Sequence, residues 1–254
     1  MTILRAILLL TLSSVVVPAA AEWLREEREL MGTRVTVEIW SEDESRAARL
    51  AREVFAEVER LDLMMNPWNP ASELSRINRE AAKATVKTTP EIIAVVERAR
   101  FYSELSDGAF DISFASVGQH YDYRAGKAPG EEDLESGRAN IDYRAIETDA
   151  AQNAIRFTLP DLQIDLGGIA KGYAVDRGIG LLQAAGVASA VVSAGGDSRL
   201  LGGKEGERPR TVGIRHPRKE GEFAVLIPLA DTAVSTSGDY ERFFVSDGVR
   251  HHHI

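Results

Sequence analysis

One segment constrains the fold more than any other: an apolar run that ends in an aspartate and two glycines, "IDLGGIAKGYAVDRG" (164–178). After the glycines, small residues recur at the spacing of a helix: Ala170, Ala174 and Gly178 lie four residues apart and so share one face. That face carries almost no side-chain volume. We therefore expect a helix after Gly168 that packs closely on a sheet.

Other segments alternate between strand and helix patterns. Apolar and polar residues alternate in "RVTVEIW" (34–40), which predicts a strand, and "VASAVVSAGG" (187–196) predicts a buried one. Apolar residues recur at helical spacing over 47–61, and Thr89-Pro90-Glu91 is typical of a helix start. The predicted fold class is α+β, or mixed α/β: a single domain with partly antiparallel sheets packed by helices.

Three further predictions concern less regular segments. Ser41 and Glu44 have the spacing of a capping box before the first helix. Residues 118–140 are polar and glycine-rich, so we expect an irregular excursion there. The segment "AIRFTLPDLQIDL" (154–166) is interpreted as a pair of strands around Pro160-Asp161.

Residues 1–21 have the pattern of a secretory signal peptide. Arg5 precedes an apolar run over 6–17, and a proline and three alanines follow. We expect cleavage after Ala21, export to the periplasm and a mature domain of residues 22–254. A membrane anchor is the alternative, but the run is short for a span. No cysteine is present to carry a lipid at the cleavage site.

The composition excludes several classes of site. Because it has no cysteine, the chain has no disulfide, no thiolate metal ligand and no cysteine nucleophile. Its formal net charge of −9 argues against a basic surface that binds nucleic acid. At 254 residues, 44% of them hydrophobic, the chain is long enough to bury a substantial core.

The glycine pair at the start of the predicted helix suggests a phosphate site. Bare backbone N–H groups and the positive end of the helix dipole attract phosphate. The Asp165 carboxylate would repel it unless a cation such as Mg²⁺ lies between them. Lys171 could reach the same ligand. The alternative is structural: Gly167 and Gly168 permit a tight turn, and Asp165 caps the helix. The segment is neither a G-x-G-x-x-G motif nor a P-loop.

Other segments also combine glycine or serine with acidic or amide side chains: "MGTRVTV", "SELSRIN", "DGAFD", "SAGGDSRLLG" and "STSGDYERFF". Together with "DLGGIAKGYAVD", they resemble the ApbE family of FAD:protein FMN transferases over residues 31–254. The resemblance implies an enzyme that binds FAD with Mg²⁺. It would transfer the FMN half to a threonine of an exported or membrane redox protein and release AMP. The implied partner is an acceptor with a Ser/Thr-containing flavinylation motif.

The resemblance assigns flavin contacts to the first half of the chain. Met31 would pack on the flavin. Trp68, in "NPW" where the family usually has tyrosine, would stack on the isoalloxazine or adenine ring. Ala109, Phe110 and Asp111 match the "AFD" that lines the dinucleotide site. From the residues alone, Trp68 or Phe110 could instead belong to the core, and Asp111 could be a turn residue.

The second half of the chain would supply the remaining contacts. By the same resemblance, Asp165 contacts the flavin nucleotide, the backbone carbonyl of Gly168 coordinates the metal, and Lys171 lies beside the phosphates. His253, in "FFVSDGVRHHHI", is the candidate base for the threonine proton, and Ile254 touches FAD. The alternative for these histidines is a trimmed purification tag or a frayed end.

The sequence also departs from the family pattern. That pattern continues with D-P-x-T-G and with Asp and Thr metal ligands, so we expect a domain truncated at its C-terminus. "ISFASVGQHYDY", after "GAFD", lacks the usual proline. Two other functions stay open: an FAD pyrophosphatase that gives FMN and AMP, and a flavin-binding or scaffold protein without turnover.

Overall fold

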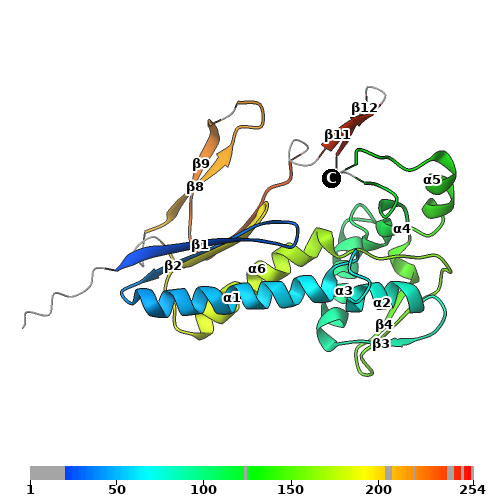
Figure 1. The fold of residues 1–254 in the computed structure, drawn as a ribbon, viewed down its shortest axis with the longest axis horizontal. Coiled ribbons are helices and arrows are strands. Elements are labelled where there is room, and N and C mark those ends of the chain that lie inside the picture. Colours follow the sequence, from blue (N-terminus) through cyan, green and yellow to red (C-terminus); the bar gives the residue numbers. More distant parts are fainter. Residues whose placement is uncertain are drawn as a thin grey trace, which may run out of the picture.

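The structure is a computed structural model that describes residues 21–122, 125–203, 208–219, 221–238, 243–246 and 249–252. Its central sheet is antiparallel, with the strand order β1–β2–β6–β7–β10 (Figure 1). The strands are β1 (Glu22–Leu30), β2 (Thr33–Ser41), β6 (Ala190–Ala194), β7 (Asp197–Leu201) and β10 (Ala233–Ser235).

Helices α1 (Glu44–Met65) and α6 (Gly167–Ala184) pack against this sheet and against each other (Figure 1). The predicted bare face of α6 lies in this interface. A Cβ atom at Gly178 would lie 2.9 Å from Cγ1 of Val54 on α1 and 3.3 Å from Cγ1 of Val192 on β6. The close packing of this helix on a sheet is therefore confirmed.

A second group of elements gathers around the C-terminal end of α1 (Figure 1). It contains a smaller antiparallel sheet with the order β3–β5–β4. Its strands are β3 (Val86–Lys87), β4 (Ile146–Asp149) and β5 (Ala154–Phe157). Its helices are α2 (Glu73–Glu80), α3 (Pro90–Leu105), α4 (Ala115–Gly118) and α5 (Glu131–Arg138), with short 3₁₀ helices η1 (Ile112–Phe114) and η2 (Tyr143–Ala145). Apolar side chains of both groups form one core cluster.

Two hairpins complete the described chain. Strand β8 (Arg210–Arg215) pairs with β9 (Phe223–Leu229), and β11 (Phe243–Ser246) pairs with β12 (Val249–His252). Among the described residues, no helix is both long and apolar enough to span a bilayer. The proposed signal peptide lies almost wholly outside the described ranges.

The mixture of helices and antiparallel sheets confirms the predicted fold class. The start of α3 is also as predicted, because Oγ1 of Thr89 accepts a hydrogen bond from the Ile92 N–H at 3.3 Å. The predicted cap of α1 is wrong: Asp43 occupies the cap position, and its carboxylate accepts the Arg46 N–H at 2.9 Å.

Two predictions for the connecting segments are also wrong. Residues 118–140 contain α5, which is stabilised by three acidic residues in its first turn and by Arg138 in its last turn. Of the two strands expected around Pro160, only β5 forms. The backbone of Ile164 bonds instead to the side chain of Asn78, which satisfies it without a strand partner.

Candidate functional site

Residues 165–168 lead into α6 and are called the glycine turn below. Its two glycines are exposed, Asp165 is half-buried, and Leu166 is fully buried. The Asp165 carboxylate accepts the Gly167 N–H at 2.6 Å, and Lys171 Nζ donates to the Gly167 carbonyl at 2.8 Å. In the described part of the chain, the Gly168 N–H has no hydrogen-bond partner. Since Gly167 and Gly168 are both exposed, this backbone donor is open to a ligand.

The ring of Phe110 lies against the glycine turn. A Cβ atom at Gly168 would be 2.9 Å from Cε2 of this ring, so only glycine fits without displacing it. The two segments are also joined through the backbone, because the Asp165 N–H donates to the Ile112 carbonyl at 2.9 Å. Ala109, next to Phe110, is exposed at the same place. The structure thus brings together the "AFD" and "DLGG" segments.

Asp111 supports this region through backbone hydrogen bonds. One carboxylate oxygen accepts from the N–H and the hydroxyl of Ser113, at 2.8 and 2.6 Å. The other accepts the Tyr143 N–H at 3.0 Å. Both oxygens therefore have partners within the protein, as expected if Asp111 is a turn residue.

Asn78, the last residue of "SELSRIN", holds the chain just before the glycine turn. Its side-chain amide donates to the Ile164 carbonyl and accepts the Ile164 N–H, both at 2.9 Å. This pair mimics one step of a strand ladder and fixes where the turn begins. Sequence reasoning did not single out Asn78.

The turn between β6 and β7 approaches the same end of α6. Asp197 accepts a 2.6 Å hydrogen bond from the Ser235 hydroxyl, and its other oxygen lies 3.9 Å from where a Cβ at Gly172 would be. A Cβ at Gly196 would lie 2.2 Å from the Thr236 carbonyl oxygen, so that position needs glycine. The "SAGGD" and "DLGG" segments and residues 235–238 ("STSG") therefore meet around the start of α6.

For the remaining predicted residues, the described part of the chain shows no contact with the glycine turn. Met31 is half-buried, with a positive φ of 52° that costs a non-glycine residue about 1 kcal/mol. Trp68 is 69% exposed, and no ring contact is described for it. This exposure argues against Trp68 as a core residue. His253 and Ile254 lie outside the described residues.

The described residues fit a dinucleotide better than a bare metal ion. The glycine turn offers open backbone, Phe110 offers a ring, and Lys171 offers a positive charge. Within the described ranges, no group of three histidine or carboxylate side chains could hold a metal. Cavities of about 350 and 810 Å³ are lined by other residues, and Gly167 and Gly168 are exposed at the turn.

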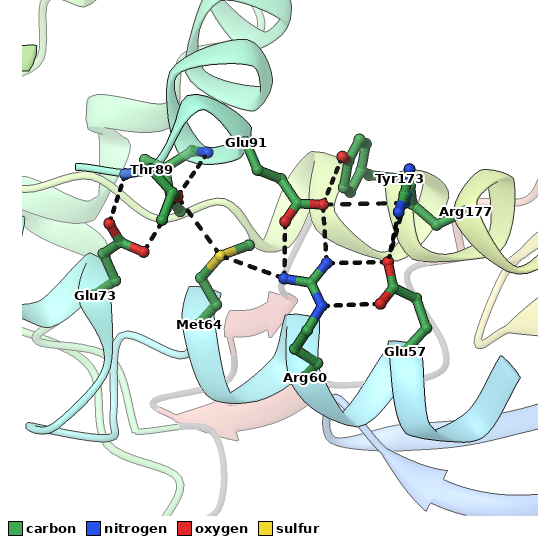
Figure 2. Close-up of polar contacts among 9 residues, drawn as sticks. Glu57, Arg60, Met64, Glu73, Thr89, Glu91, Tyr173 and Arg177 are labelled. Carbon is green, nitrogen blue, oxygen red and sulfur yellow. Dashed lines mark hydrogen bonds and ion pairs between the residues drawn. The ribbon is translucent and has the colours of Figure 1, made fainter. Parts of the chain in front are cut away.

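Further along α6 from the glycine turn, an ion-pair network joins α1, α3 and α6 (Figure 2). Arg60 on α1 forms 2.8 Å ion pairs with Glu57 and with Glu91 on α3. Arg177 on α6 contacts Glu57 at 3.0 Å, and the Tyr173 hydroxyl donates to Glu91 at 2.8 Å. The network therefore fixes α6 about two turns from its first residue.

This network shifts the pKa values of its members. The hydrogen bond from Arg60 is the main cause that lowers the pKa of Glu57. Burial is the largest single influence on Glu91 and would raise its pKa, but the bonds from Arg60 and Tyr173 and the nearby cations together lower it. Burial, followed by the bond to Glu91, raises the pKa of Tyr173 to about 12. At neutral pH both carboxylates are charged and the tyrosine is neutral.

A family model described as the ApbE family matches residues 31–254. The chain belongs to the ApbE family. The resemblance predicted from its motifs is confirmed, and the match spans the segments that meet at the glycine turn.

Curated relatives of this chain are named FAD:protein FMN transferases. A FAD:protein FMN transferase of Treponema pallidum is 31% identical over 242 residues, 89% of this chain and 67% of that protein. One of Vibrio cholerae is 30% identical over 212 residues, 81% of this chain and 62% of that protein. The chain therefore spans about two thirds of these relatives. The matches support the prediction of an enzyme of the flavin-transferase class.

Solved structures of family members have the same fold. An ApbE protein of Thermotoga maritima matches with a TM-score of 0.83 and 30% identity, over 91% of this chain and 75% of that one. The flavin transferase ApbE of Vibrio cholerae matches with a TM-score of 0.77 and 26% identity, over 89% and 75%.

Proposed function

We propose that this chain is a flavin transferase that moves FMN from FAD to a threonine hydroxyl of an exported or membrane redox protein and releases AMP. The observation that carries the proposal is the exposed glycine turn, where the Gly168 N–H is open and the Phe110 ring lies against the backbone. Open amides at a helix start suit a pyrophosphate, and an aromatic ring beside them suits a flavin or an adenine.

The predicted residues other than Asp111, whose carboxylate is bound within the protein, have roles in this proposal. Lys171 places its ammonium group beside the turn, where it would offset phosphate charge. Asp165 would fix the turn and the nucleotide. Met31, Trp68 and Ile254 would contact FAD, while Ala109 and Phe110 would line the dinucleotide site.

The reaction is a phosphoryl transfer. The threonine oxygen would attack the phosphorus of the FMN half, a new P–O bond would form, and the P–O bond to AMP would break. His253 would take the hydroxyl proton, and AMP would leave with the bridging oxygen. Positioning of the two reactants against fixed backbone donors would supply most of the rate enhancement.

Mg²⁺ belongs to the proposal as a partner of the pyrophosphate. When bound, it would neutralise phosphate charge. The Gly168 carbonyl would be one of its protein ligands, at the glycine turn. We further propose that the protein works in the periplasm after signal-peptide cleavage, on an acceptor with a Ser/Thr-containing motif.

One experiment distinguishes the candidate activities. The full chain is incubated with FAD and Mg²⁺, with and without a periplasmic redox subunit that carries a candidate Ser/Thr motif. Transfer predicts covalent flavin fluorescence on the acceptor and AMP in solution, both lost with EDTA. Free FMN without the acceptor would indicate a pyrophosphatase instead, and binding of FAD without AMP release would indicate a flavin-binding protein.

A further inference from the structure

The turn between β1 and β2 holds Met31 in a conformation that side chains rarely adopt. Leu30 pairs with Thr33, so Met31 and Gly32 form a two-residue loop, with φ angles of 52° and 66°. Loops of this kind favour Asn-Gly or Asp-Gly. The turn therefore does not explain why methionine occupies the first position. Its side chain packs partly against the apolar core, and the part that stays exposed is available for contact with a ligand.

Asp62 on α1 fixes this turn from outside the hairpin. The Met31 N–H donates to Oδ2 of Asp62 at 2.9 Å, in a partly buried contact that spans 31 residues of sequence. In a two-residue hairpin loop, the N–H of the first loop residue has no partner in the strand ladder. Asp62 supplies that partner. Its own position is fixed because its neighbour Leu61 is fully buried in the core.

The start of β2, next to the turn, is held to the same region by a second contact. The Gly195 N–H donates to the Arg34 carbonyl at 3.1 Å, and a Cβ at Gly195 would lie 3.0 Å from Oγ1 of Thr33. Gly195 belongs to the turn that carries Asp197 to the side of α6. The Met31 loop is therefore connected by direct contacts to the last turn of α1 and, through the turn between β6 and β7, to the start of α6.

We infer that Asp62 is a positioning residue for FAD binding, which acts by holding the Met31 loop so that the methionine side chain meets the flavin. The inference rests on the proposed function, because that function makes Met31 a flavin contact. Asp62 itself touches backbone and needs no contact with the substrate. An acceptor of the same shape should therefore replace it, whereas a small apolar side chain should not.

The test compares Asp62→Ala and Asp62→Asn in the full chain. Asn keeps an oxygen that accepts the Met31 N–H, whereas Ala does not. We expect Asp62→Ala to raise the Kd for FAD about tenfold, with a transfer rate at saturating FAD close to that of the unaltered chain. Asp62→Asn should restore most of the affinity.

Asp43→Ala is the matched control. It also removes a carboxylate that accepts a backbone N–H, but at the opposite end of α1, about 28 Å away. It should lower stability without changing the Kd for FAD. Equal FAD affinity in Asp62→Ala and the unaltered chain would overturn the inference, as would equal loss in the Ala and Asn variants. If the unaltered chain bound no FAD, the proposed function itself would fail before any substitution was compared.

Discussion

The Tyr173 hydroxyl donates a 2.8 Å hydrogen bond to Oε1 of Glu91, and this contact ties α6 to the first turn of α3. Glu91 is also bound by Arg60 of α1, so three helices meet at one carboxylate (Figure 2). Tyr173 lies in the same helix as the glycine turn. The orientation of that turn therefore depends on contacts that α6 makes further along its length, at Tyr173.

Tyr173→Phe should lower the free energy of unfolding by about 1.5 kcal/mol at pH 7, because it removes a hydrogen bond to a charged acceptor. The Tyr173 pKa is raised from 10.0 to about 12 in the folded protein. The neutral hydroxyl therefore stabilises the fold fully below pH 10, and this contribution is lost as the pH rises towards about 12. Urea unfolding at several pH values measures the difference.

Tyr102→Phe is the control for this change, since Tyr102 is 43% exposed on α3 and lies outside the network. It should change stability by less than about 0.5 kcal/mol. If Tyr173→Phe differed from the unaltered protein equally at pH 7 and above pH 12, the hydrogen bond would not be the cause.

Arg60→Met should lower stability by about 1–2 kcal/mol at pH 7. The value is below that of a fully buried pair, because 45% of the Arg60 side chain is exposed. Glu57 and Glu91 have pKa values lowered from 4.5, so their pairing stabilises the protein above pH 4.5 and is lost as the pH falls below it. The variant should therefore unfold at a higher pH than the unaltered chain during acid titration.

Arg49→Met provides the comparison on the same helix. Arg49 pairs with Glu53 four residues away, but both side chains are more than half exposed. Loss of this pair should lower the free energy of unfolding by less than about 0.5 kcal/mol and leave the pH midpoint of acid unfolding unchanged. Circular dichroism during acid titration of both variants measures this. Equal acid midpoints would contradict a special role for the Arg60 network.

The sequence predicted the glycine turn but not the side chains that hold it. The glycine pair and the small residues after it are local signals, so the helix and its close packing could be inferred. Asn78 contacts Ile164 across 86 residues, and Asp62 contacts Met31 across 31. Such contacts depend on how the elements pack, and no local spacing encodes them.

Local spacing was also misleading in places. Local spacing does not single out Arg60, which becomes central because α3 brings Glu91 to it and α6 adds Tyr173 to the same carboxylate. The strand expected after Pro160 is absent because a side-chain amide satisfies that backbone. In both cases a tertiary partner, rather than local propensity, decides the outcome.

His253→Ala should leave FAD affinity within about twofold of the unaltered chain and abolish flavin transfer, because the proposed role is removal of the acceptor proton. The measurement pairs an FAD titration with covalent flavin fluorescence on the acceptor. His120→Ala, a change in a partly exposed histidine near Asp133, is the control and should retain transfer. A His253→Ala variant that modified the acceptor at the full rate would make another group the base.

Gly168→Ala tests the contact between the glycine turn and Phe110. The added methyl would lie 2.9 Å from Cε2 of the ring, so the ring must move away from the turn. The gain in helix propensity, about 1 kcal/mol, offsets part of that cost, and overall stability should change little. FAD affinity should fall about tenfold, because the ring would no longer be held beside the open amide.

Gly180→Ala separates helix propensity from the site. Gly180 lies in the same helix and is exposed, and a Cβ there would have nothing within 4 Å apart from its chain neighbours and the nearby backbone of the helix. The substitution should raise stability by about 0.5–1 kcal/mol and leave FAD affinity unchanged. Flavin fluorescence titration and urea unfolding of both variants measure the two effects separately. If Gly168→Ala bound FAD as tightly as Gly180→Ala, the position of the Phe110 ring would not matter for binding, and the glycine turn would lose the aromatic half of its proposed site.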